Sequence, residues 1–91
     1  MVSQMGEAFI VYNTKTKKNI YKRIIELTEA GKRRGDCVMV TALGDDAESP
    51  IFGEGDFILA TVRLSTHEYN GQFYNDAILD DYLTLIKNNP N

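Results

Sequence analysis

The sequence predicts a small domain built mainly from β-strands, and local signals at three places carry this prediction. The pair Asn70-Gly71 separates two stretches of strand-like composition. Asn and Gly tolerate the positive φ angles of a two-residue hairpin turn better than other residues do. The run Cys37–Leu43 is rich in β-forming residues and has a Gly-Asp pair at each end. A third apolar run of strand length is Ala8–Tyr12.

The turn at Asn70-Gly71 also predicts the pairing of the hairpin strands, because a two-residue turn fixes the register. Counted outward from the turn, the predicted pairs are Tyr69 with Gln72, His67 with Tyr74, Ser65 with Asp76, Leu64 with Ala77 and Val62 with Leu79. The face expected to meet a core carries Ala60, Val62, Leu64, Ala77 and Leu79. The opposite face, which suits a ligand, carries Arg63, Ser65, His67, Tyr69, Tyr74 and Asp76.

Two segments fit either a helix or a strand. Ile20–Ala30 places Ile20, Ile24 and Leu27 on one helical face, with Asn19 as a candidate N-cap. The same segment also alternates with period two, as a strand does. Residues 77–87 carry apolar side chains at helical spacing, with a proline beyond the end. Local periodicity leaves both segments open.

Length and composition indicate one small intracellular domain. The 91 residues are enough for one core, and residues 1–6 and 87–91 are expected to fray. No apolar run is long enough to cross a membrane and no secretory signal is evident, so a cytoplasmic location without membrane partners is expected. The single cysteine, Cys37, excludes an internal disulfide and a multi-cysteine zinc site. A homo-oligomer is compatible with the sequence, which does not specify the oligomeric state.

The charge is distributed unevenly along the chain. Residues 15–34 hold eight of the ten basic residues and two acidic ones, a net charge of +6, whereas the remainder carries −9. A basic segment on an acidic domain suits an anionic partner, although solvated surface charge gives the same count.

Several short elements occur in a characteristic order from the Cys37 strand onward. They are Leu43-Gly44-Asp45-Asp46-Ala47-Glu48, Gly53-Glu54-Gly55-Asp56-Phe57, Arg63-Leu64-Ser65-Thr66, Glu68-Tyr69-Asn70-Gly71, and finally Tyr74 and Asp76. In this order they resemble the second half of the OB-fold single-stranded-DNA-binding proteins of bacteria and phages. The resemblance covers about half the chain, and its strength lies in the order of individually weak elements.

The resemblance implies a five-stranded Greek-key barrel and reads both ambiguous segments as strands. The implied strands lie near Ala8–Tyr12, Ile20–Thr28, Gly35–Leu43, Phe57–Thr66 and Gln72–Leu79 or beyond. The helix that normally follows the third strand is reduced to about 46–52. Asp80-Asp81 departs from the family, which often has an aromatic and a basic residue there. The implied function is non-specific single-stranded DNA binding in replication, recombination or repair, with a phage as one expected source.

Non-specific binding of single strands needs cations that follow the phosphates and rings on which bases stack. In an OB fold the loops at 14–19 and 68–72 would flank the ligand groove. The expected nucleic-acid-binding residues are Lys15, Lys17, Lys18, Tyr21, Arg23, Lys32, Arg33, Arg34, Arg63, Tyr69 and Tyr74. Phe9 and Phe57 are interpreted as core residues.

The sequence gives little support for an enzyme, and no catalytic residue, metal or cofactor is expected. His67 is the only histidine and has no evident base partner. The acidic corner Asp45, Asp46 and Glu48 matches no complete Ca²⁺-binding loop.

Two alternatives remain. If the helical periodicity holds, the order is strand, helix, strand, strand, helix, and the chain resembles a truncated, three-stranded flavodoxin-like electron-transfer protein. Thr14, Thr16 and Asn19 would then hold the phosphate of FMN at a helix N-terminus, although the loop lacks the usual glycine. The other alternative is an OB-type module that binds a protein.

Overall fold

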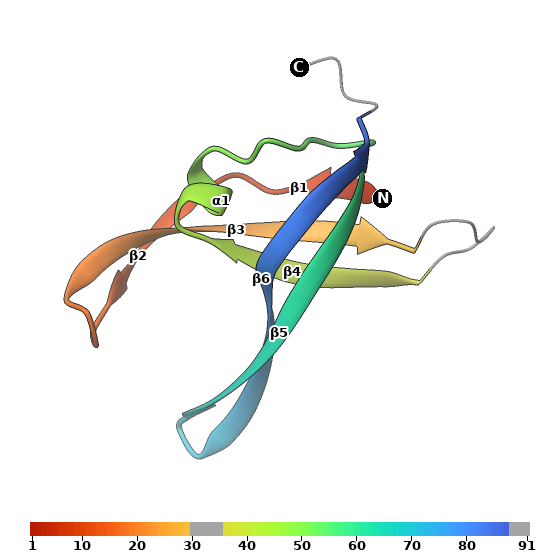
Figure 1. Ribbon diagram of the computed structural model, residues 1–91. Coiled ribbons are helices and arrows are strands. Elements are labelled where there is room, and N and C mark those ends of the chain that lie inside the picture. Colours follow the sequence, from red (N-terminus) through yellow and green to blue (C-terminus); the bar gives the residue numbers. More distant parts are fainter. Residues whose placement is uncertain (30–35, 88–91) are drawn as a thin grey trace.

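The structure, a computed structural model, describes residues 1–29 and 36–87 and is all-β apart from one short helix (Figure 1). Its elements are β1 (Val2–Met5), β2 (Phe9–Asn13), β3 (Lys18–Thr28), β4 (Cys37–Leu43), α1 (Asp45–Glu48), β5 (Phe57–Tyr69) and β6 (Gln72–Ile86). The all-β prediction is therefore confirmed. None of the helices in the described residues is long and apolar enough to cross a membrane.

All six strands belong to one sheet, in the order β1-β3-β4-β6-β5, with β2 also pairing to β3. β4 and β6 run parallel and meet at Thr41 and Ile78, whereas the other pairs are antiparallel. The sheet is not closed, and β1 and β5 form its two ends. Two backbone hydrogen bonds still bring these ends together, because Val2 donates to Asp56 and accepts from Gly55, just before β5.

The two ambiguous segments are both strands. β3 pairs with β1 and β2 on one side and with β4 on the other, and β6 pairs with β5 from Gln72 to Ile86. Each segment pairs with a neighbouring strand along almost its whole length, so strand pairing overrides the local helical pattern. The α/β alternative is therefore wrong. Asn19 lies within β3, and no helix begins after the loop to supply the phosphate-binding N-terminus that the FMN alternative requires.

The hairpin register follows the prediction in all five pairs, from Tyr69 opposite Gln72 to Val62 opposite Leu79. Asn70 and Gly71 have φ angles of 52° and 77°, as the two-residue turn requires. Two residues of the predicted core face differ from the prediction, because Leu64 is 78% exposed and Val62 is 37% exposed instead of buried in the core. The strands are long enough to extend the hairpin beyond the core as a projecting arm (Figure 1).

The core lies between the curved sheet and the segment around α1. Its buried hydrophobic residues are Val2, Ile25, Val40, Ala42, Ala47, Phe52 and Leu79. Phe52 packs edge-on against Tyr82 with 4.7 Å between the ring centroids, and burial raises the pKa of the Tyr82 hydroxyl. The expected fraying of residues 1–6 is not found, because β1 pairs with β3 and Val2 is fully buried. At the other end, residues 88–91 lie outside the described residues.

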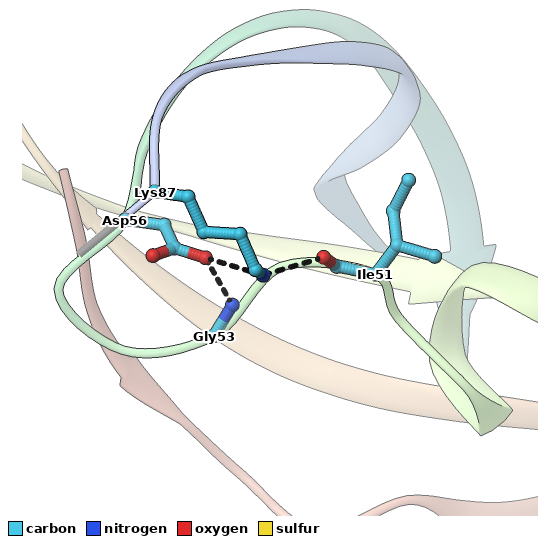
Figure 2. Close-up of polar contacts among 4 residues, drawn as sticks. All are labelled: Ile51, Gly53, Asp56 and Lys87. Atoms are coloured by element: carbon cyan, nitrogen blue, oxygen red, sulfur yellow. Dashed lines mark hydrogen bonds and ion pairs between the residues drawn. The ribbon is translucent and has the colours of Figure 1, made fainter. Parts of the chain in front are cut away.

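A buried carboxylate fastens the root of the β5–β6 hairpin (Figure 2). Asp56 immediately precedes β5 and its side chain is fully buried. Its Oδ2 accepts a hydrogen bond from the Gly53 backbone N–H at 2.8 Å and lies 3.5 Å from Nζ of Lys87, just after β6. Lys87 Nζ also donates to the Ile51 carbonyl at 3.1 Å. These contacts, with the backbone bond from Val2, join β1, the segment before β5 and the end of β6 at one junction.

Candidate nucleic-acid interface

Alternation along β3 defines two faces of the sheet. Tyr21 and Leu27 pack against the core and Ile25 is fully buried, so these residues mark the inner face. Their neighbours in sequence point to the opposite side, which we call the outer face. On β3 the outer face carries Lys18, Ile20, Lys22 and Ile24.

Phe9 belongs to this outer face. It pairs with Lys22 across β2 and β3, and paired residues share one side of a sheet. Its side chain is 44% exposed, so the interpretation of Phe9 as a core residue is wrong. Tyr21, expected to stack on bases, packs instead on the inner side and does not present its ring on the outer face. Both errors concern the side of the sheet to which a side chain points. Alternate residues of a strand point to opposite sides, so a shift of one residue exchanges the inner and outer faces.

The outer face continues onto the β5–β6 hairpin through the parallel contact between β4 and β6. Thr41 pairs with Ile24 on one side and with Ile78 on the other, so Ile78 lies on the outer face as well. Alternation and pairing along the hairpin then place further side chains on this face: Arg63, Ser65, His67, Tyr69, Gln72, Tyr74 and Asp76. Side chains from three separate regions of the chain therefore share one surface.

A groove lies on this surface between the β2–β3 hairpin and the β5–β6 hairpin. It has a volume of about 450 Å³, and its lining includes Val11, Lys15, Ile20, Lys22 and His67. The groove therefore joins apolar, aromatic and cationic groups from two hairpins that are far apart in the sequence. Its size and open form suit an extended ligand lying across the sheet.

The tip of the β2–β3 hairpin holds its lysines in a defined turn. The side-chain Oδ1 of Asn13 accepts hydrogen bonds from the backbone N–H groups of Lys15 and Thr16, at 2.9 and 3.3 Å. Lys17 has a φ of 57°, which completes the reversal of the chain. No ion pair joins Lys15, Lys17, Lys18 or Lys22 to a carboxylate of the described residues. Their charges are thus available to an anionic ligand.

The rings on the β5–β6 arm are held by local contacts. His67 and Tyr74 stack with 5.6 Å between centroids and 23° between ring planes. Nδ1 of His67 lies 3.4 Å from Oδ2 of Asp76, and the Tyr74 hydroxyl donates to Oε1 of Gln72 at 2.9 Å. Tyr69, next to the turn, is 64% exposed. The arm therefore presents one ordered ring pair and one open ring on the outer face.

Arg63 and Arg23 have different surroundings. Nε of Arg63 lies 4.0 Å from Oδ1 of Asp80, and both side chains are more than half exposed, so this contact is weak. Arg23 lies on the inner set of β3, where its Nε donates to the Ala47 carbonyl at 2.7 Å and its Nη1 to the Gly6 carbonyl at 3.1 Å. The guanidinium of Arg23, expected to contact phosphate, instead fastens α1 and the β1–β2 connection to the sheet.

We expect Arg23→Met to lower the free energy of unfolding by about 2 kcal/mol, because two hydrogen bonds from a charged group are lost. Urea denaturation followed by circular dichroism measures this loss. The matched control is Arg63→Met, which removes an exposed guanidinium and should change the unfolding free energy by less than about 0.5 kcal/mol. Equal stability of the two variants would contradict the structural role of Arg23.

Lys32, Arg33 and Arg34, also expected at the interface, lie outside the described residues. Within 1–29 and 36–87, no three His, Cys, Asp or Glu side chains gather as a metal site would require. Comparison with protein-family models, with curated proteins and with solved structures finds no match. The fold and the geometry of the outer face are thus the basis for any functional conclusion.

Proposed function

We propose that this protein is an OB-type module that binds single-stranded DNA without sequence preference and acts in replication, recombination or repair. The observation that carries the proposal is the groove on the outer face, which Lys15 and Lys22 of the β2–β3 hairpin line together with His67 of the β5–β6 hairpin. Cations beside exposed rings are what a single strand requires, because its phosphates and unpaired bases are both accessible.

The strand arrangement supports the OB-type part of the proposal. An OB fold is a partly open five-stranded barrel whose ligand groove lies across its second and third strands, between two hairpin loops. If β1 and β2 count as two halves of one first strand, β3 and β4 become the second and third strands. The two backbone hydrogen bonds that Val2 makes, donating to Asp56 and accepting from Gly55, would mark the place where the barrel approaches closure.

The proposed binding mode assigns separate roles to the two hairpins. Lys15, Lys17, Lys18 and Lys22 contact the phosphates, while Tyr69 and the His67–Tyr74 pair stack on bases. Phe9 on the outer face offers a further stacking surface beside Lys22. The carboxylates of Asp76 and Asp80 lie 3.4 Å from Nδ1 of His67 and 4.0 Å from Nε of Arg63, so the arm carries negative as well as positive charge. Salt-sensitive binding of moderate strength follows from this mixture of charges.

Neutralising Lys15 and Lys22 together should weaken the salt dependence of binding. Each lost contact with a phosphate of a single strand lowers the slope of log affinity against log salt by about 0.7, so the double variant Lys15→Gln/Lys22→Gln should lose about 1.4. Fluorescence anisotropy with labelled oligothymidine over a series of salt concentrations gives the slope. Arg23→Met serves as the control and should keep the native slope, since its guanidinium faces inward. A native slope in the double variant would place the phosphate path elsewhere.

A further inference from the structure

β5 is a long strand with one unpaired edge. It spans 13 residues at the end of the sheet, and β6 is its only partner strand (Figure 1). In the described residues no backbone hydrogen bond joins β5 to any strand but β6. Such an edge presents a row of N–H and C=O groups that readily pair with another strand.

This edge lacks the usual protection against pairing. Natural edge strands carry charges, prolines or bulges that block a second strand. Between Phe57 and Ser65, β5 contains no proline and one charged residue, Arg63. The β5–β6 register shifts after Phe57 and after Thr61, but both shifts place the extra residue in β6, so β5 itself carries no insertion. Its apolar side chains are nevertheless open to solvent: Leu59 is 63% exposed and Leu64 is 78% exposed. An apolar, unprotected edge indicates a strand that is covered when the protein is assembled.

The exposed area of the chain is large enough to supply an interface. The chain exposes 6794 Å², whereas a folded monomer of 10.3 kDa exposes about 5,400 Å². The excess is about 1,400 Å² over the whole chain, including the ten residues outside the described part. A standard interface takes roughly 800 Å² from each partner. This excess belongs to the whole chain and not to β5 alone, and it is larger than one face of a standard interface.

We propose that a second copy of this chain pairs along β5, antiparallel and across a two-fold axis at Thr61. In this register Ile58 lies opposite Leu64 of the partner subunit, and Ala60 lies opposite Val62 of the partner subunit. All four side chains belong to the inner set of β5, so each apolar residue meets an apolar residue. The same patch serves both copies, as a two-fold interface requires. The inference is independent of DNA binding.

The first test measures mass in the absence of nucleic acid. Size-exclusion chromatography with light scattering at micromolar concentrations should give a dimer, twice 10.3 kDa. Leu64→Lys should give a monomer, because it places a charge within the apolar interface while its side chain is already exposed in the single chain. Ile10→Lys, at an apolar position of β2 that is 56% exposed, is the control and should remain dimeric.

The second test checks the register by a cysteine cross-link. In a Cys37→Ser background, Thr61→Cys places two thiols opposite each other at the two-fold axis. Paired Cα atoms in antiparallel strands are about 4.5 to 5.5 Å apart, within the range for a disulfide. Mild oxidation should then give a covalent dimer on a non-reducing gel, whereas Ser65→Cys should not cross-link. A native monomer, a dimer that persists in Leu64→Lys, or no cross-link at Thr61→Cys would each overturn the proposal.

Discussion

Asp56→Ala should lower the free energy of unfolding by about 3 kcal/mol, a larger loss of stability than we expect from Arg23→Met. The fully buried carboxylate accepts from Gly53 and faces Lys87, so its removal leaves a partly buried N–H without its acceptor and breaks the link between the segment before β5 and the end of β6. An unsatisfied buried donor alone costs about 1 to 3 kcal/mol, and the lost contact with Lys87 adds to it. Urea denaturation measures the loss, and the melting temperature should fall by more than about 10 °C.

Asp80→Ala provides the matched control for Asp56→Ala. Its carboxylate is 56% exposed and lies 4.0 Å from Arg63, so we expect a change of less than about 0.5 kcal/mol. Lys87→Met should also destabilise the protein, because it leaves the Asp56 carboxylate buried without its cation. Stabilities of Asp56→Ala and Asp80→Ala that agree within error would contradict the role given to the junction.

Tyr69→Ala and Tyr74→Ala should each weaken binding of single-stranded DNA by about 10- to 100-fold. Loss of one stacked base costs about 1 to 3 kcal/mol, and stacking does not depend on counterion release. The loss should therefore be similar at low and high salt, unlike the effect of the lysine variants. Anisotropy titrations with oligothymidine at two or more salt concentrations measure both the loss and its salt dependence.

Phe73 is the control for these two tyrosines. It lies on the same hairpin and is 73% exposed, but it pairs with Glu68 on the inner side of the arm. Phe73→Ala should therefore bind as the native protein does. Equal losses in Phe73→Ala and Tyr74→Ala would mean that the outer face has no special role.

The β5–β6 hairpin was predictable because its determinants are local. Asn70-Gly71 specifies the turn, and the turn specifies every pair down to Val62 opposite Leu79. The exposure of Leu64 was not predictable in the same way. It depends on how far the arm extends beyond the core, and the period-two pattern contains no information about length.

The N-terminal half depends on contacts between distant parts of the chain. Val2 is buried because it meets residues 55 and 56 and the end of β3, and nothing in the first six residues indicates this. β3 fits a helix or a strand by its own sequence, and its partners on both sides make it a strand.

The candidate site was predicted in part. The lysines at 15, 17 and 18 and the rings at 69 and 74 lie on the two hairpins that flank the groove. Arg23 and Tyr21 face inward, whereas Phe9 faces outward. Phe9 could have been assigned to the outer face from its position opposite Lys22. That position can be predicted only if the length of the turn between β2 and β3 is known. That turn has no Asn-Gly pair to specify it.

A binding isotherm for labelled oligothymidine, measured from low to moderate salt, tests the proposed function most directly. We expect saturable binding at low salt whose affinity falls as salt rises, with weaker competition from duplex DNA than from unlabelled single strands. Absence of binding at the lowest salt concentration, or binding that is equal for single-stranded and duplex DNA, would contradict the assignment of the outer face to single strands.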